Sequence, residues 1–431
     1  MNNIFLDENV LRISYFRMSK SETENLIIKL KNINLVEIKI NYLYCDLYKS
    51  GFYLLMESLR NNNTLQKFQI DSISLKNFNF DLIVDILKSI KTLREITLSY
   101  NWINYLDFKK LICILEVNKN LLKIDVGHNR IGRRGAEAIA DALKNNKTLQ
   151  KLYLRNNKIE SPGAEALAEA LKNNNTLLEL DLGDNEIDFS GTKALIDALK
   201  GNNTLLKLDI SNSNIDSVST LLDTKLQKLS ISGCNLLLAD FFELLKFNKT
   251  LQELDISENK MCITEKEGII EVLKINTTLQ KLDISSNNLR DSGIRELAEV
   301  LKNNTTLKEL CIRKNKIGIE GVKCLAGLLK VNKTLTKLDI YENQIENSGI
   351  EIMEDAINHN VTLLEFKFHH FLVKKEVRNR IMFSLSINEE IQNSFETLSL
   401  YFPNEIAIKI ISYIIPNFVI PFDLLCNKLI N

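Results

Sequence analysis

Leucines recur along the chain at a nearly fixed interval. Those that open an L-x-x-L-x-L stretch, or a close variant of it, are Leu35, Leu65, Leu93, Leu121, Leu149, Leu177, Leu205, Leu226, Leu251, Leu279, Leu307, Leu335 and Leu363. Nine of the twelve intervals are 28 residues, and the others are 30, 21 and 25. A period of this length indicates an array in which each repeat is one supersecondary unit stacked on the next.

Each repeat opens with the pattern of a short strand. In the repeat that starts at Leu149, Leu152 and Leu154 are two residues apart, so both side chains point to one face of a strand. Lys151 and Tyr153 then lie on the opposite face. The pattern predicts a strand with one buried face and one polar face.

The second half of each repeat predicts a turn and a helix. Asn157 follows the strand, where its side-chain amide can satisfy backbone groups of the turn and of neighbouring coils. Ser161 is predicted to cap a helix, with Pro162 in its first turn, and Leu167 and Leu171 form the inward stripe. The same Asn recurs at Asn101, Asn129, Asn157, Asn185, Asn259, Asn287, Asn315 and Asn343, and a Gly at Gly135, Gly163, Gly191, Gly293, Gly321 and Gly349, where helix and strand must approach closely. Asn-x-Thr sequences at Asn62, Asn202 and Asn304 also share one repeat position, which favours a structural role over glycosylation.

The 28-residue pattern LxxLxLxxNxIgxxGaxxLaxxLxxNxtL resembles the ribonuclease-inhibitor-type leucine-rich repeats, which also occur in NOD-like receptors and in the Ran GTPase-activating protein. The resemblance covers residues 35–368. It implies an α/β solenoid in the form of a horseshoe, with a concave parallel β-sheet, convex helices and about 13 repeats. Residues 1–34 resemble a degenerate capping coil, and residues 369–431 are expected to form a small helical segment.

The array is irregular over residues 205–250. The repeat that starts at Leu205 has 21 residues, too few for the usual helix, and Ser213 replaces its Asn. The next repeat has 25 residues with Cys234 at that position, where a thiol can still act as a weak donor. We expect a thinner or bent region here, which is either a tolerated deletion or a functional hinge.

Two columns of charge follow the predicted open face of the sheet. Two residues after the opening Leu stand seven lysines and six glutamates, and four residues after it stand Asp125, Asp181, Asp209, Asp255, Asp283 and Asp339. Neighbouring strands lie about 4.8 Å apart, so we expect the aspartates to pair with the adjacent lysine column. The face is then either a self-paired, solvated surface or a negative strip that steers a basic partner.

Aromatic and arginine side chains are the other candidates for partner contacts, because binding hot spots favour them. Trp102, Tyr153, Arg155 and Tyr341 join the aspartates as the predicted partner-binding residues of the concave face. Tyr100, Arg313, His128, His369 and His370 lie near them in the repeat pattern.

Composition narrows the classes of function. The chain has 431 residues, with 55 basic and 55 acidic side chains, a balance that argues against nucleic-acid binding. The start of the chain lacks a signal-peptide pattern, and the apolar stretch 406–425 is interrupted by Lys409, Pro416, Pro421 and Asp423, so we expect no membrane span. Seven scattered cysteines without a C-x-x-C pair predict free thiols and a cytoplasmic protein.

The sequence offers little for catalysis. The four histidines form no metal-ligand spacing, and no phosphate-binding glycine loop is present. The repeated carboxylates are a surface pattern before they are acid–base candidates. We therefore expect neither an enzyme nor a cofactor or metal site.

The tail carries a second resemblance. Residues 374–397 are predicted to be helical, and Phe402, Pro403, Glu405, Ile406, Ile410, Ile411 and Ile414 then resemble the opening of an F-box. Short C-terminal versions of this kind resemble the PRANC segments of viral and intracellular-bacterial repeat proteins, which recruit the Skp adaptor of a cullin ubiquitin ligase. That origin would place the protein in the cytosol of a eukaryotic host. The other interpretation of residues 402–431 is a cap over the last coil.

The leading hypothesis is therefore a non-enzymatic scaffold that binds a protein on its concave face. In its sharper form it is a substrate receptor for a cullin-type ubiquitin ligase, with the tail docking the adaptor. The alternative is a regulator of a partner enzyme, either an inhibitor like the ribonuclease inhibitor or an activator like the Ran GTPase-activating protein. That activator family carries a long acidic C-terminal region, which this chain does not have.

Overall fold

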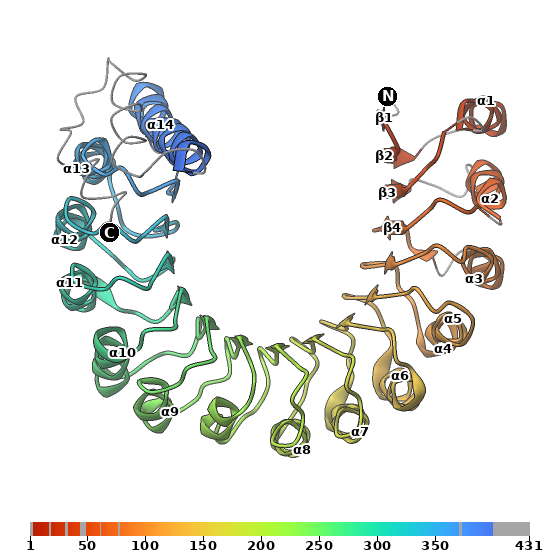
Figure 1. Cartoon of the computed structure of the whole chain (residues 1–431), viewed down its shortest axis with the longest axis horizontal. Helices are drawn as coiled ribbons and strands as arrows, with labels where there is room; N and C mark the ends of the chain where they lie inside the picture. Colours follow the sequence, from red (N-terminus) through yellow and green to blue (C-terminus); the bar gives the residue numbers. More distant parts are fainter. Residues whose placement is uncertain are drawn as a thin grey trace. The chain divides into compact units, whose positions relative to one another are not determined.

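A computed structural model describes residues 3–16, 19–30, 33–43, 49–60, 62–75, 78–369 and 373–399. The chain forms two compact units, residues 1–234 and residues 235–431. In each unit the strands line one side and the helices the other (Figure 1). The elements of the first unit are β1 (Asn3–Asp7), β2 (Val10–Phe16), α1 (Lys20–Leu30), β3 (Glu37–Leu43), α2 (Lys49–Ser58), β4 (Lys67–Asp71), α3 (Phe80–Ser89), β5 (Glu95–Thr97), α4 (Tyr105–Ile112), α5 (Ile114–Val117), β6 (Lys123–Asp125), α6 (Gly132–Asn145), β7 (Lys151–Tyr153), α7 (Glu160–Leu171), β8 (Glu179–Asp181), α8 (Phe189–Leu199), β9 (Lys207–Asp209), the 3₁₀ helix η3 (Ser219–Asp223) and β10 (Lys228–Ser230).

The second unit repeats the same alternation. Its elements are α9 (Ala239–Leu245), β11 (Glu253–Asp255), α10 (Ile263–Ile275), β12 (Lys281–Asp283), α11 (Arg290–Leu301), β13 (Glu309–Cys311), α12 (Ile319–Leu329), β14 (Lys337–Asp339), α13 (Asn347–Asn358), β15 (Glu365–Lys367) and α14 (Lys375–Ser399). Within both units, strands from β2 onward pair in parallel and in sequence order.

The leucine ladder predicted the strands of the array correctly. Each of the thirteen opening leucines lies two residues before a strand, from β3 to β15. The sequence did not predict the first strands, because residues 3–16 do not carry the ladder. There β1 pairs antiparallel with β2, and β2 pairs parallel with β3, so a hairpin closes the edge of the sheet.

The Asn ladder forms the hydrogen bonds that the sequence predicted. Asn157 is fully buried. Its Nδ2 donates to the Leu154 carbonyl of its own coil and to the Val126 carbonyl of the preceding coil, both at 2.9 Å. Its backbone N–H donates to Oδ1 of Asn185 in the following coil at 2.7 Å. The side chain and the backbone N–H of one buried Asn thus link three successive coils.

A second Asn ladder follows the helices. Asn174 donates from Nδ2 to the Leu143 carbonyl of the preceding coil at 2.9 Å, while its Oδ1 accepts the backbone N–H groups of Thr176 and Leu177. Asn202 and Asn304, which stand in Asn-x-Thr sequences, occupy the same position and are buried. This position therefore has the structural role that its regular recurrence predicted.

The short repeat at residues 205–225 has the 3₁₀ helix η3 in place of an α-helix. Ser213, which replaces the ladder Asn, is buried, and its hydroxyl has no hydrogen-bond partner. In the next repeat the Cys234 thiol donates to the carbonyls of Ile210 and Ser232 at 3.5 Å. As predicted, the thiol takes the place of the amide, although each of its hydrogen bonds is weaker.

The predicted role of Ser161 as a helix cap is wrong. Helix α7 begins at Glu160, and its N-cap residue, Ile159, makes no side-chain cap hydrogen bond. Ser161 lies inside the first turn, where its hydroxyl accepts the backbone N–H of Asp188 at 2.9 Å. The residue ties its coil to the next one, a role that one repeat considered alone cannot reveal.

Helix α14 ends the described part of the array. Ile381 and Ile391 are buried, and Asn388 continues the second Asn ladder by donating to the carbonyls of Asn360 at 3.0 Å and Leu363 at 2.8 Å. The helix does not turn into a further strand after Asn388 but runs on to Ser399. It therefore satisfies the open backbone groups of the last coil and covers it.

The glycine ladder marks a close approach between the helices of successive coils, not between helix and strand as the sequence predicted. A Cβ on Gly191 would lie 2.9 Å from the Cα of Ser161 in the preceding helix and 2.7 Å from Cγ2 of Ile187. A Cβ on Gly201, ten residues further along, would have no atom within 4 Å. Backbone contact makes the first site intolerant of even one methyl group.

We expect Gly191→Ala to destabilise the protein by about 1–3 kcal/mol, because neighbouring coils must move apart. The matched change Gly201→Ala should be neutral or stabilise by up to about 1 kcal/mol, because it only reduces the entropy of the unfolded chain. Denaturant midpoints of the two variants measure the difference. Equal midpoints would show that the coils can separate without cost.

Candidate functional site

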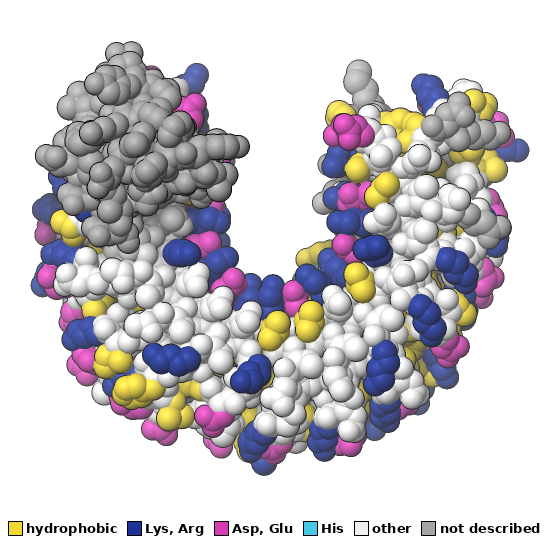
Figure 2. Space-filling model, in the orientation of Figure 1, with side chains coloured by type: hydrophobic (Ala, Val, Ile, Leu, Met, Phe, Trp, Pro, Cys, Tyr) yellow, Lys and Arg dark blue, Asp and Glu magenta, His cyan; other side chains and the backbone are white. Residues whose placement is uncertain are grey.

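The strand side of each unit exposes two residues per strand. In β7, for example, Leu152 is buried while Lys151 and Tyr153 on either side remain partly exposed. The same pattern holds in β6, β8, β11, β12, β13 and β14. Basic and acidic side chains are interspersed along this face (Figure 2). The alternation places all predicted concave-face aspartates here, at the ends of their strands.

Ion pairs on this face run from strand to strand along the lysine–glutamate column. Glu179 of β8 lies 3.0 Å from Lys151 of β7 and 3.1 Å from Lys207 of β9. In the second unit Lys281 lies 3.3 Å from both Glu253 and Glu309. Because the strands pair in register, the mostly alternating signs at one repeat position neutralise the column, although Lys123 lies opposite Lys151 and Lys207 opposite Lys228.

The expected pairing between the aspartate and lysine columns is largely wrong. In-register strands place Asp181 opposite Asp209, and Asp255 opposite Asp283. Equivalent positions are separated by about 4.8 Å, whereas residues two apart in one strand are about 6.6 Å apart. The lysines therefore pair with the glutamates at the same repeat position, although Lys123 does lie 3.5 Å from Asp125 within β6.

The aspartates instead hold the turn that follows each strand. Oδ1 of Asp181 accepts the backbone N–H of Gly183 at 2.9 Å, a side-chain turn that Asp forms readily. The equivalent bonds join Asp125 to Gly127, Asp209 to Ser211, Asp255 to Ser257, Asp283 to Ser285 and Asp339 to Tyr341. Their repetition thus has a backbone cause, and one oxygen of each is already engaged.

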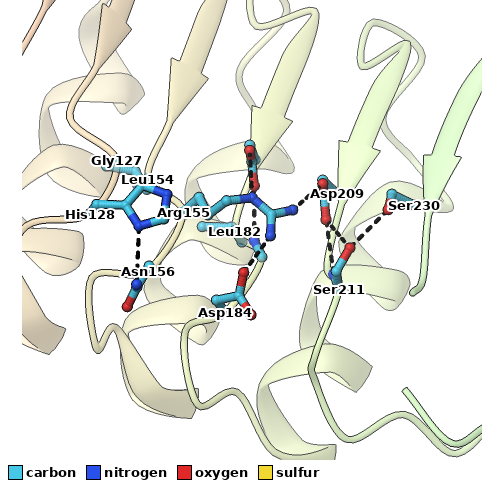
Figure 3. A network of polar contacts seen from close by, with 12 residues as sticks. Gly127, His128, Leu154, Arg155, Asn156, Leu182, Asp184, Asp209, Ser211 and Ser230 are labelled. Atoms are coloured by element: carbon cyan, nitrogen blue, oxygen red, sulfur yellow. Dashed lines mark hydrogen bonds and ion pairs between the residues drawn. The ribbon is translucent and has the colours of Figure 1, made fainter. Parts of the chain in front are cut away.

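Arg155 gathers three carboxylates from two neighbouring coils (Figure 3). Its guanidinium contacts Asp181 at 3.4 Å and forms close ion pairs with Asp184 and Asp209. Asp209 also accepts from the Ser211 hydroxyl at 2.5 Å, and Ser211 lies 2.8 Å from Ser230. The arginine compensates the repulsion that the register creates between two aspartates, and its five donors are largely used within the protein.

Tyr153 belongs to the same surface. Its hydroxyl donates a short hydrogen bond to Glu179, and the Lys123 ammonium lies 5.0 Å from the centre of its ring. Burial raises the pKa of Glu179, but hydrogen bonds from Tyr153, Lys151 and Lys207 outweigh it and lower this pKa to about 2. The glutamate therefore stays ionised at any physiological pH.

Asp181 shows the opposite shift. Burial and the charge of Asp209 raise the pKa of Asp181 to about 6, although Arg155 opposes them. Two carboxylates that share one guanidinium cannot both be fully stabilised when they are partly buried. This part of the face therefore carries a charge that changes between weakly acidic and neutral pH.

The remaining predicted residues form stacked pairs near the ends of the strands. The Tyr100 ring stacks on His128 with centroids 4.0 Å apart, and the Arg130 guanidinium lies 3.9 Å from the centre of Trp102. In the second unit Tyr341 stacks on His369 at 4.9 Å, with Arg313 at 5.0 Å from the centre of the tyrosine ring. His370 and residues 402–414 lie outside the described residues.

Sequence reasoning missed Asp184 and Arg130. Both occupy turn positions beside the ladder Asn, where the repeat pattern shows no constant residue type. The 28-residue spacing itself contained the signal, since it aligns Asp184 with Asn156 and Arg130 with Trp102 in adjacent coils. A comparison of the residues on either side of the ladder Asn in successive repeats would have identified Asp184 and Arg130.

The described residues offer no evident reaction centre. No group of three or more His, Cys, Asp and Glu side chains among them could hold a metal ion. Burial and the charge of Asp283 raise the pKa of Cys311 to about 12, so its thiol is protonated and a poor nucleophile. The described helices also include none with the length and apolarity needed to cross a membrane.

Comparison with known proteins identifies the fold. The family model described as "Leucine Rich repeat" matches residues 117–140, 145–168, 173–195, 276–298, 303–326 and 331–351. The fold is a leucine-rich-repeat solenoid. No curated protein sequence matches the chain.

A solved structure supports the leucine-rich-repeat fold. A crystal structure of the Rad7 and Elc1 complex in yeast is similar over 84% of this chain and 86% of that chain, with a TM-score of 0.53 and 18% identity. The TLR13-ssRNA13 complex has a TM-score of 0.48 and 16% identity over 86% of this chain and 51% of that one. Actin-binding site 2 of leiomodin-1 has a TM-score of 0.34 and 21% identity over 37% of this chain and 93% of that one.

The Asp181 pKa predicts how stability depends on pH. A carboxyl group whose pKa is raised by folding lowers the stability of the folded state as pH increases from about 4 to about 6. Asp181→Asn retains the acceptor for Gly183 N–H but has no charge to bury. We expect its melting temperature to rise relative to the native protein across this pH range and to stay higher at pH 7. If the melting temperatures of the two proteins changed with pH in parallel from pH 4 to pH 7, the raised pKa of Asp181 would be contradicted.

Proposed function

We propose that this leucine-rich-repeat protein is a non-enzymatic scaffold that binds a protein partner on the strand face. The open face of the parallel sheet carries this proposal. Parallel sheets are usually covered on both sides, yet the flanking residues of β6–β8 and β11–β14 remain partly exposed. A polar face of this kind is well suited to a partner that supplies the missing layer.

The partner contacts are expected at the departures from the repeat pattern. The lysine–glutamate column is neutralised by its own ion pairs, and surface pairs of this kind contribute only about 0–1 kcal/mol each. Tyr153 and Tyr341 offer large amphipathic side chains of the type that dominates binding energies. The carboxylates around Arg155, three against one guanidinium, favour a partner with a basic surface.

A second part of the proposal concerns residues 402–431. Helix α14 satisfies the backbone of the last coil through Asn388, so the F-box-like segment from Phe402 is not required as a cap. We infer that this segment docks a Skp-type adaptor and that the repeats select the substrate of a ubiquitin ligase in the cytosol. The five described cysteines are free thiols, consistent with a reducing compartment. The yeast structure of similar fold, solved as a complex of Rad7 with Elc1, adds a fold-level analogy only.

Replacing the tyrosines tests the strand face. We expect Tyr153→Ala or Tyr341→Ala to weaken binding of proteins captured from a eukaryotic lysate by about tenfold or more, as for other aromatic hot spots. Phe189→Ala and Phe247→Ala remove exposed aromatic side chains from the helix side and should leave binding unchanged. Quantitative mass spectrometry of the captured proteins gives the readout. An equal loss of binding in all four variants, or no loss in any of them, would exclude the strand face as the binding site.

The adaptor hypothesis is tested separately. Ile410→Asp and Ile414→Asp in the full chain should abolish capture of a purified Skp-type adaptor, because a charge is costly to bury in an apolar interface. Met382→Asp, on the exposed side of α14, is the control. An adaptor that does not bind the native chain, or that binds all variants equally, would reject the ligase role and leave the strand face as the binding site.

A further inference from the structure

A groove lies on the helix side of the first unit, between α4–α5 and α6. Figure 1 shows where these helices lie in the chain. The coil that starts at Leu93 has an interrupted helix: α4 ends at Ile112 and α5 begins at Ile114. The neighbouring coils have one continuous helix each, α3 and α6. The groove beside the interrupted helix has a volume of about 1010 Å³.

The floor of the groove is apolar and is formed by residues from both helices. Ile112 and Leu115 contribute from one side and are mostly buried, while Ala138 and Ala142 contribute from the other. The two alanines are four residues apart, so they lie on the same face of α6. Their small side chains leave space for apolar groups of a ligand.

Most of the unpaired charges of the groove are positive. Among its lining carboxylates, Glu137 pairs with Arg133 at 2.7 Å and Asp141 pairs with Lys144 at 2.8 Å. The lining cations are Lys109, Lys119, Arg134 and Lys147. Within the described part of the chain no carboxylate forms an ion pair with any of these four cations, and Glu116 is the remaining lining carboxylate. A ligand therefore meets an excess of uncompensated cations above an apolar floor.

One arginine of the groove lies over an aromatic ring. The Arg134 guanidinium lies 5.9 Å from the centre of the Tyr105 ring, and both residues line the groove. A contact of this kind orients a guanidinium while its N–H donors stay available for a carboxylate.

We propose that this groove is a second interaction surface, which binds an acidic, amphipathic segment of a partner protein. Apolar side chains of the segment lie against Ala138 and Ala142, and its carboxylates face Arg134 and Lys147. The apolar floor and the three lining carboxylates distinguish the site from a track for a phosphate backbone, which requires continuous positive charge. The proposal is independent of binding on the strand face.

Selection of short peptides from a random library on the full-length protein tests the chemistry. We expect the selected peptides to combine Asp or Glu with apolar residues. In fluorescence anisotropy titrations, Arg134→Glu and Lys147→Glu should each weaken their binding by about tenfold, as for charges that face each other across an interface. Lys333→Glu is the matched control, because Lys333 occupies the same repeat position as Lys147 in the second unit.

Three outcomes would overturn the proposal. In the first, the selection yields no acidic apolar peptides. In the second, the selected peptides bind Lys147→Glu and Lys333→Glu equally. In the third, a single-stranded oligonucleotide binds the native protein better than the peptides do, and Arg134→Glu and Lys147→Glu abolish its binding. Ala142→Gln provides a variant without a change in charge, which should also weaken peptide binding by narrowing the groove. Melting curves establish that each variant is folded. Tyr153→Ala should bind the peptides normally, so failure of this proposal and failure of the strand-face proposal are distinguishable.

Discussion

The structure depends on buried hydrogen bonds between successive coils. A single coil leaves the carbonyl and N–H groups of its turns without partners, and an unpaired buried polar group costs about 1–3 kcal/mol. Asn157 and Asn174 supply these partners from within the array, because each amide bonds to the backbone of the coil before it. A coil is therefore most stable between neighbours of the same geometry, and this favours the 28-residue period.

The same requirement determines the chemistry of the strand face. Coils that repeat in register place like positions side by side, so a column of identical charges would repel itself. The lysine–glutamate column largely avoids this by alternating sign, and the aspartate pair Asp181–Asp209 avoids it through Arg155. Most polar side chains of the face thus maintain the array, and specificity can come from the few positions that depart from it, such as Tyr153.

The sequence predicted the fold well because the period of the leucines reports directly on the core. It predicted all thirteen strands from Leu35 onward and the roles of Asn157 and Cys234. It failed for two contacts that depend on the register: the lysine–aspartate pairing was largely wrong, and the contact of Ser161 with Asp188 was missed. The sequence of a single repeat does not show which residues of neighbouring coils lie next to each other. These contacts depend on that register.

The hydroxyl of Ser213 and the thiol of Cys234 have a consequence for how the first unit unfolds. In an array stabilised by nearest neighbours, unfolding starts at the least stable interface and spreads from there. The coils at residues 205–234 lack the ladder amide and have a single turn of 3₁₀ helix. Amide protons of β9 and β10 should therefore exchange with solvent before those of β7 and β8, and the first unit should lose these two coils while the rest of its sheet remains folded.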